Sequence, residues 1–256
     1  MVIIRKEQME VFEEDARQNF EDEMVEHIKH FSPAHCESIG DDAVREVVKD
    51  GIQRAEAYGF TNRGPVRFFI ETIFLLGSYF DTDPQYPWAA KILNDIEITD
   101  QMERSNLLYE KVVDYMERVM GPDNEYANAA YTQFLNFELG KLPKLDLQYD
   151  NAEDYFNHDI LDYLAFLYPK KVIYTNEDAI KKLIQEALEV AEENFSVADW
   201  SASLFTLMMF FWGHDCFNDR QFPWISNILD DELEYDEKAA SLCLSIKDHI
   251  TQVALK

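Results

Sequence analysis

The sequence repeats itself at an offset of 136 residues, and the two copies stay aligned without a gap. The agreement is densest between residues 74–95 and residues 210–231. The residues shared there are Gly77, Asp83, Gln85, Pro87 and Trp88, matched by Gly213, Asp219, Gln221, Pro223 and Trp224. Weaker identity continues in the same register outside this segment. The pattern predicts a tandem duplication, so the chain must fold as two similar halves.

Each copy has the spacing of a series of helices. Apolar residues recur every three or four positions in residues 9–31 and 156–167, and Pro33 and Pro169 are expected to end these helices. In the first copy, further helices are predicted after Gly40, at about 62–80, in a short segment that ends near residue 94, and at about 100–120. In the second copy, the matching helices are predicted after Asn176, at about 197–216, in a short segment that ends near residue 230, and at about 236–255. The third helix of each copy is nearly apolar all round and should be central.

The predicted fold class is all-α: a tandem-duplicated helical domain with about five helices per copy plus a linker helix near residues 125–139. The expected divisions are a first repeat at 1–120, a linker at 121–150 and a second repeat at 151–256, with both repeats packed as one body.

The loop that both copies share has a structural explanation. Asp83 and Asp219 are expected to cap the turn that follows each of them, and Trp88 and Trp224 to anchor the loop on the core.

Composition decides between a folded and a disordered acidic chain. The formal net charge is −27, but 47% of the residues are hydrophobic and 14% are aromatic, so a large core can form. The charge argues against a nucleic-acid surface and against adsorption to anionic lipid, both of which need clustered Lys and Arg. With no signal peptide, no membrane-length apolar run and three unpatterned cysteines, we expect a cytoplasmic protein.

The candidate chemical motifs are weak. Asp81-Thr82-Asp83 resembles the start of a calcium loop, but Ile92 stands where the bidentate Glu belongs and Phe217 replaces Asp81 in the second copy. Ser203 and His214 lie on one predicted helix without a nucleophile elbow.

The tightest group of potential zinc ligands is His27, His30, His35 and Cys36, and the second copy does not retain it. We therefore expect no catalytic residue, no metal site and no cofactor, with an enzyme of unknown type as a lesser alternative.

The negative charge divides almost equally between the halves, −14 in residues 1–136 and −13 in the remainder. Such charge is either a solvated exterior or a surface that steers a basic partner protein toward the chain. The candidate partner-binding residues are those of two dense acidic runs: Glu10, Glu13 and Glu14, and Asp230, Asp231, Glu232, Glu234, Asp236 and Glu237.

Several short motifs in residues 3–115 carry a family resemblance: Arg5-Lys6-Glu7-Gln8-Met9, Gly51-Ile52, Arg54-Ala55, Ala57-Tyr58-Gly59, Phe80-Asp81-Thr82-Asp83-Pro84 and Pro87-Trp88-Ala89. They resemble a family of small, uncharacterised bacterial helical proteins associated with type VI secretion effector and spike gene clusters. The second copy keeps mainly Asp219, Gln221, Pro223 and Trp224. The resemblance implies no catalytic residues.

That setting implies one of two binding roles. The first is an immunity protein that neutralises a cognate, basic, secreted toxin by occluding it. The second is a chaperone or adaptor that holds an effector for loading. Acidity favours the immunity role, and the oligomeric state stays open.

Overall fold

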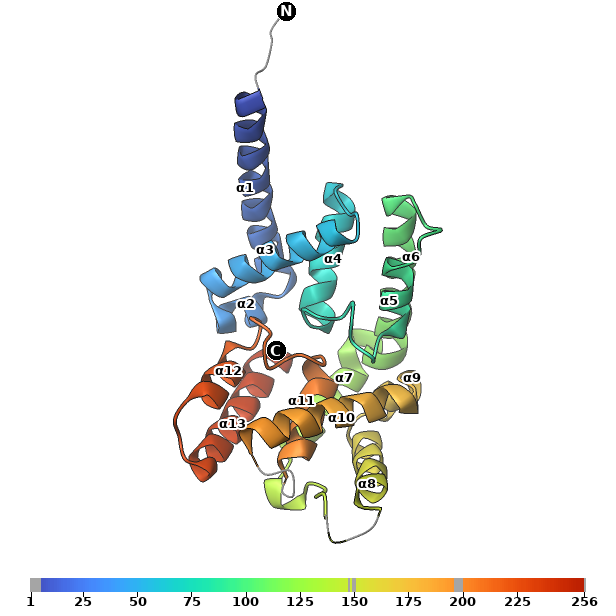
Figure 1. Cartoon of the computed structure of the whole chain (residues 1–256), viewed down its shortest axis with the longest axis vertical. Helices are drawn as coiled ribbons and strands as arrows, with labels where there is room; N and C mark the ends of the chain where they lie inside the picture. The colour runs from blue at the N-terminus through green and yellow to red at the C-terminus, as the bar shows by residue number, and fades with distance from the viewer. Residues whose placement is uncertain (1–5, 147, 149–150, 196–199, 256) are drawn as a thin grey trace, which may run out of the picture.

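The computed structural model describes residues 6–146, 148, 151–195 and 200–255, without the side chains of residues 6–11 and 13. Within these ranges the chain is all-α, as the sequence predicted, with no β-strand (Figure 1). The helices are α1 (Lys6–Phe31), α2 (Pro33–Ile39), α3 (Asp41–Ala57), α4 (Arg63–Leu76), α5 (Pro87–Leu93), α6 (Gln101–Tyr115), α7 (Glu125–Leu135), α8 (Ala152–Leu167), α9 (Pro169–Tyr174), α10 (Glu177–Asn194), α11 (Ser201–Trp212), α12 (Pro223–Asp230) and α13 (Tyr235–His249). One turn of π-helix continues α6 and another continues α13.

Helices α1–α6 and α8–α13 follow one another in the same order, which gives six helices per half and not the five that we expected. The missed elements are α2 and α9. Pro33 and Pro169 do end the helices before them, but each is also the first residue of a new short helix. Proline suits that position because its missing N–H would have no partner there.

The central helices end four residues earlier than expected. Gly77 and Gly213 terminate α4 and α11 with φ of +102° and +106°, a conformation that continues no right-handed helix. Every residue of α11 is buried, as its apolar sequence predicted. The prediction was wrong for one side of α4, where Arg63 and Arg67 face solvent.

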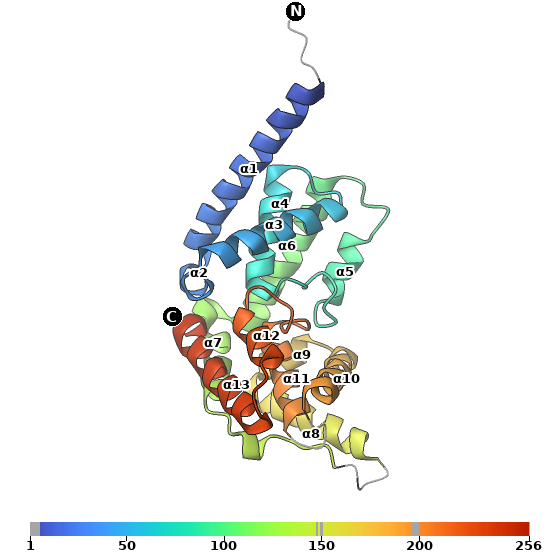
Figure 2. The same ribbon diagram turned by 60° about the vertical axis from the view of Figure 1, so that its left-hand side comes forward.

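The halves share one continuous hydrophobic core, and the predicted linker helix is α7, which lies where they meet (Figure 2). Helix α1 packs against this core over only part of its length. Met24, Val25 and Ile28 enter the core, whereas Phe12 is 60% exposed on a segment that projects from the body. None of the described helices is both long and apolar enough to cross a membrane.

The loops after α4 and α11 cross between the halves by reciprocal contacts. The Asp83 carboxylate accepts from the backbone N–H of His214 at 2.9 Å, and the Asp219 carboxylate accepts from that of Ser78 at 2.8 Å. The side-chain amide of Gln85 donates to the Met209 carbonyl near the C-terminal end of α11, and that of Gln221 donates to the Ile73 carbonyl near the C-terminal end of α4, at 3.1 Å in both cases. Equivalent residues thus exchange equivalent bonds. This reciprocity agrees with a duplicated unit, although the duplication itself stays a prediction.

The local roles expected of these loops are confirmed. Asp83 Oδ1 accepts from the Gln85 N–H at 2.8 Å, and Asp219 Oδ1 accepts from the Gln221 N–H at 2.9 Å. The indoles of Trp88 and Trp224 pack, partly buried, against the core. The sequence did not reveal that the same aspartates also join the two halves.

Candidate functional site

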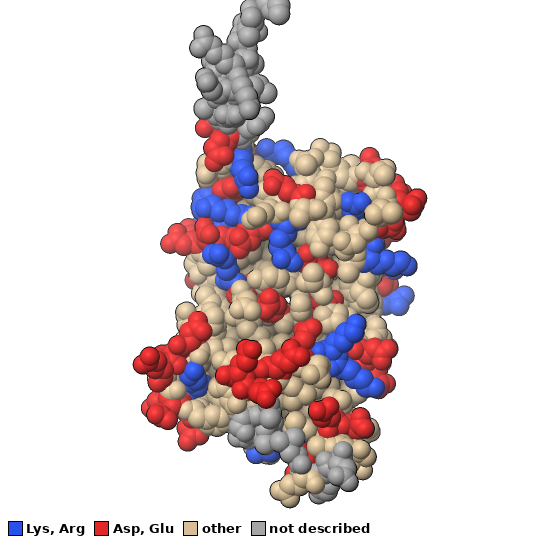
Figure 3. All heavy atoms as spheres, viewed as in Figure 1, with Lys and Arg blue, Asp and Glu red and all other residues tan. Residues whose placement is uncertain are grey.

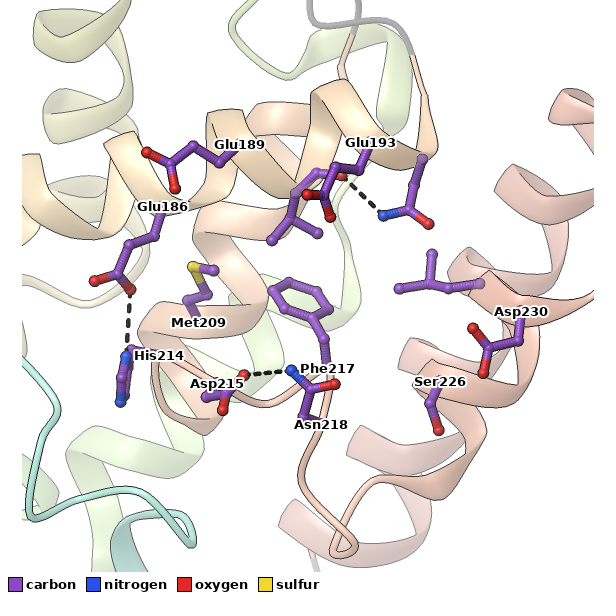
Figure 4. A pocket seen from close by; sticks show the side chains of 13 residues that line it. Glu186, Glu189, Glu193, Met209, His214, Asp215, Phe217, Asn218, Ser226 and Asp230 are labelled. Atoms are coloured by element: carbon purple, nitrogen blue, oxygen red, sulfur yellow. Dashed lines mark hydrogen bonds and ion pairs between the residues drawn. The ribbon is translucent and has the colours of Figure 1, made fainter.

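A pocket of about 550 Å³ lies in the second half, between α10, the loop after α11, and α12. In Figure 4 helix α10 lies above the pocket, the loop with His214, Asp215 and Asn218 lies below it, and α12 lies at one side. The polar residues that line it are Glu186, Glu189, Glu193, Asn194, His214, Asp215, Asn218, Ser226 and Asp230. Five of these carry a carboxylate, and no described lining residue is a Lys or Arg.

The acidic wall follows from the register of α10. The Asn176 side chain caps this helix by accepting from the Ala179 N–H at 2.8 Å. A stripe of buried Ile, Leu and Ala packs α10 against α11. Glu186, Glu189 and Glu193 follow at spacings of three and four, so they lie on one face beside that stripe and above the pocket.

The floor of the pocket is apolar. Val190, Met209, Phe217 and Leu229 line it together with the carboxylates. Figure 4 shows the Phe217 ring between α10 and α12. This ring also packs edge-on against Phe205, with 5.1 Å between centroids, so its position is fixed from below. An apolar floor under charged walls suits a ligand with a flat, weakly hydrated cationic group.

His214 is the one basic side chain of the described lining. Its Nδ1 lies 3.3 Å from Glu186 Oε2, and its Nε2 lies 3.1 Å from Thr82 Oγ1. Burial lowers the pKa of His214, but the Glu186 hydrogen bond and the charges of Asp83, Glu186 and Asp215 outweigh burial and raise this pKa above its usual value. The neighbouring carboxylates therefore stabilise the protonated ring relative to that of a free histidine.

The order Thr82, His214, Glu186 resembles a nucleophile, a base and an orienting carboxylate. The Thr82 hydroxyl, however, also lies 3.1 Å from the Tyr79 carbonyl oxygen, to which it can only donate. It then accepts from the Nε2–H of His214, whose second N–H is directed at Glu186. Because the Thr82 proton is directed at Tyr79 and not at the imidazole, His214 is not placed to activate this hydroxyl, and the contact links the halves structurally.

The structure places the two predicted acidic runs far apart. Asp230 lies in the pocket wall, and the run continues from there as exposed side chains along the α12–α13 connection and the first turn of α13: Asp231, Glu232, Glu234, Asp236 and Glu237. Glu14 is exposed on α1 at the other end of the molecule, and the side chains of Glu10 and Glu13 lie outside the described residues. The two runs do not form one surface.

Sequence reasoning missed most of the pocket. Glu186, Glu189, Glu193, His214 and Asp215 were not among the predicted partner-binding residues. The spacing of the three glutamates beside a buried stripe was a usable signal, but the residues opposite them depend on where α12 packs.

Three buried basic groups lie elsewhere, where the halves meet. Burial lowers the pKa of His35 to about 4, that of His249 to about 3 and that of Lys171 to about 8. Lys171 Nζ donates to the carbonyl oxygen of Phe210, and the rings of His35 and His249 lie 5.8 Å apart. These groups are packed into the core and do not face the acidic pocket.

The histidine and cysteine group considered for zinc is dispersed. His27 contacts Glu71 at 2.6 Å, His30 contacts its own helix backbone, and Cys36 donates to the carbonyl of Ile28. In the ranges that the structure describes, no three His, Cys, Asp or Glu side chains are placed to hold a metal ion.

Comparison with known proteins adds no family: the chain matches no protein-family model, no curated protein and no solved structure. The fold and the pocket define an all-α protein with an acidic pocket in its second half.

Proposed function

We propose that this chain is an immunity protein that binds a cognate, basic, secreted bacterial toxin and neutralises it by occlusion. The supporting observation is the unneutralised pocket. Among the described residues, Glu189, Glu193 and Asp230 make no ion pair, so a concave surface of a protein with net charge −27 keeps free negative charge. Such a surface costs self-repulsion and is best explained by a cationic partner.

The distribution of ion pairs indicates which half faces the toxin. In the first half many carboxylates are neutralised by neighbours, as in the pairs Arg45–Asp22 at 2.7 Å and Arg67–Glu71 at 2.9 Å. In Figure 3 the two signs of charge mix over the upper half, whereas acidic side chains gather around α10 and over α12 and α13. We infer that the second half makes the contact. A toxin surface that is basic because it binds nucleic acid would fit this charge.

The effector chaperone or adaptor is the alternative. Such a role calls for a broad apolar surface that holds an unfolded or partly folded client. In the part of the chain that the structure describes, exposed large apolar side chains are instead spread over different elements, among them Phe12 on α1, Ile96 after α5, Tyr109 on α6, Tyr155 and Phe166 on α8, Ile173 on α9 and Leu244 on α13. The acidic pocket is the more concentrated feature, so occlusion of a basic toxin is favoured.

Co-expression with the effector encoded by the adjacent gene tests the proposal. We expect a complex at low salt that weakens at high salt, and survival of cells that express the toxin. Protection without a change in effector stability or secretion separates immunity from chaperone activity. Absence of a complex at low salt would overturn both roles.

Matched charge reversals locate the contact. Glu189→Lys with Glu193→Lys changes the charge of the pocket wall by the same amount as Glu110→Lys with Glu117→Lys, two exposed positions of the first half. The pocket pair should slow association about tenfold or more, because steering depends on the local potential, and the control pair much less. Equal effects of the two pairs would exclude the pocket as the contact.

A further inference from the structure

The first half has a cavity at the position equivalent to the acidic pocket. It measures about 400 Å³ and lies between α3 and the loop after α4, as the acidic pocket lies between α10 and the loop after α11. Asp50 and Gln53 stand at the repeat positions of Glu186 and Glu189. The two cavities therefore provide an internal comparison of one site built with two sets of side chains.

The cavity of the first half contains a guanidinium group of the protein itself. Arg54 pairs with the carboxylate of Asp81, which is only 2% exposed. The hydroxyl of Tyr58 donates to the same carboxylate at 2.8 Å. The guanidinium lies 4.9 Å from the ring centroid of Tyr79. A second cation, Arg220, reaches in from the other half, with Nε 3.0 Å from Asp50 Oδ2.

The second half has different residues at the positions of Arg54, Asp81 and Tyr58. Val190 stands at the position of Arg54, Phe217 at that of Asp81, and Asn194 at that of Tyr58. The internal guanidinium and its buried carboxylate are both replaced, and the pocket is larger, at about 550 Å³. The second half thus has no arginine at this position, and its pocket is the larger of the two.

Without an internal cation the pocket would be expected to have fewer carboxylates around it, but the second half has more of them. Where the first half has Gln53, Ala57 and Asn94, the second half has Glu189, Glu193 and Asp230. Glu189, Glu193 and Asp230 are exposed residues of the pocket lining, and like charges on one concave surface still repel each other, so the pocket without a ligand gains nothing from three more carboxylates. The added carboxylates are explained if the cation arrives from outside.

We propose that the pocket of the second half binds a guanidinium group supplied by another molecule, an arginine side chain of the partner. This inference rests on the proposed function for the identity of the partner, but the site can be tested without it. A guanidinium is planar and weakly hydrated, donates from several N–H groups at once and stacks on aromatic rings, which fits carboxylates on several sides above an apolar floor with Phe217. A lysine ammonium carries the same charge without the planar fork.

N-acetyl-arginine amide and N-acetyl-lysine amide are the probes that test the site, titrated into the ¹⁵N-labelled full chain and followed by NMR. We expect saturable shifts of backbone resonances around Val190, Asp215 and Leu229 with the arginine amide. The lysine amide should bind about tenfold more weakly, because a bidentate charge-assisted contact is lost. Equal affinity for the two amides would overturn the assignment to guanidinium.

Two variants make the test specific. Glu189→Gln with Glu193→Gln keeps the shape of the wall and should weaken the arginine amide about tenfold or more, whereas Glu110→Gln with Glu117→Gln should leave it unchanged. Val190→Arg with Phe217→Asp rebuilds the Arg54–Asp81 pair of the first half and should abolish binding by filling the pocket. Unchanged binding in the glutamine pair overturns the site, even if the variant with the rebuilt Arg–Asp pair fails to fold.

These experiments can overturn the guanidinium site and the proposed function independently of each other. Capture of the effector by a chain that binds no arginine amide would overturn the guanidinium site and leave immunity standing. Saturable arginine amide binding without an effector complex at low salt would overturn the immunity proposal and leave the site standing.

Discussion

At the scale of single residues, two glycines set how closely the halves approach. A Cβ atom on Gly77 would lie 2.7 Å from the backbone oxygen of Trp212, and one on Gly213 would lie 3.3 Å from that of Leu76. Both residues also have positive φ, which disfavours a side chain. Backbone atoms cannot move aside as the end of a flexible side chain can. The shorter distance at Gly77 therefore makes an added methyl group more destabilising there than at Gly213.

Gly77→Ala should destabilise the protein by about 3 kcal/mol or more, and Gly213→Ala by about 1–2 kcal/mol, because only the first adds a severe clash to the φ strain. Gly64→Ala is the matched control, since a Cβ there meets nothing within 4 Å inside helix α4, and it should stabilise by up to about 1 kcal/mol. Urea denaturation measures all three. Equal losses at Gly77 and Gly213 would show that the crossing loops relax freely.

The buried histidines predict how stability depends on pH. In the unfolded chain His35 and His249 titrate near pH 6.5, but in the folded protein burial lowers their pKa values to about 4 and about 3. Between pH 6.5 and 4 the unfolded chain therefore binds protons that the folded chain does not. The unfolding free energy must fall as the pH falls through this window.

His35→Phe isolates this contribution. From pH 7 to pH 4 the wild type should lose on the order of 3 kcal/mol more unfolding free energy than the variant, which has one fewer buried histidine. Parallel curves for the wild type and His35→Phe would mean that the folded protein accepts a proton on this ring at low cost.

At the scale of elements, helix α1 combines two segments with different roles. Residues 14–19 are exposed, whereas Met24, Val25 and Ile28 are buried against the rest of the first half. The outer segment thus has helical periodicity without a core to cover it. Its stability contribution should be small, because burial and not propensity supplies most of the stability of a helix in a protein.

Deletion of residues 1–14 should change the unfolding free energy by less than about 1 kcal/mol, whereas deletion of residues 1–24 removes Phe20 and Met24 and should cost about 4 kcal/mol or more. Chemical denaturation followed by circular dichroism measures both. The shorter deletion also removes Glu10, Glu13 and Glu14, so a complex that survives it would place the partner contact elsewhere. A large loss from the shorter deletion would contradict this division of α1.

The sequence predicted those elements whose signals are local. The all-α class, the linker helix α7, the fully buried α11 and the turns capped by Asp83 and Asp219 all depend on periodicity or on neighbours in the chain. The short helices α2 and α9 were missed because a proline that ends one helix can begin the next.

Features that depend on distant packing were not accessible. The bond from the His214 N–H to Asp83 joins residues 131 positions apart, and the acidic pocket needs α12 to pack opposite α10. Only the spacing of Glu186, Glu189 and Glu193 on α10 could have pointed to the pocket, and an acidic stripe is also typical of a solvated helix face.

At the scale of the whole molecule, equal charge does not mean equal surfaces. The sequence divides the charge into −14 and −13, yet the first half neutralises much of its share through internal pairs such as Arg54–Asp81 and Lys29–Asp41. In the second half Glu189, Glu193 and Asp230 of the pocket make no ion pair with any described residue. The two halves thus differ: the first balances much of its charge internally, and the second presents it outward.

The reciprocal loops also predict that neither half is stable without the other. Asp83 and Asp219 are 2% and 3% exposed, and each accepts a backbone N–H from the opposite half. Across the same boundary Lys171 donates to the Tyr86 hydroxyl at 3.4 Å, and Tyr168 donates to the carbonyl of Val119 at 3.0 Å. Separation would expose the shared core and leave these polar groups without partners, each at a cost of about 1–3 kcal/mol.

Residues 1–146 and 151–256, expressed as separate chains, should each lack cooperative thermal unfolding and should form a folded 1:1 complex when mixed. Size-exclusion chromatography and circular dichroism measure both properties. Asp219→Ala in the second chain should weaken assembly, because the backbone N–H of Ser78 in the first chain then loses its acceptor, whereas Asp236→Ala at an exposed position should not. A first chain that unfolds cooperatively as a monomer would show that the core of one half suffices and that the crossing loops only align two independent domains.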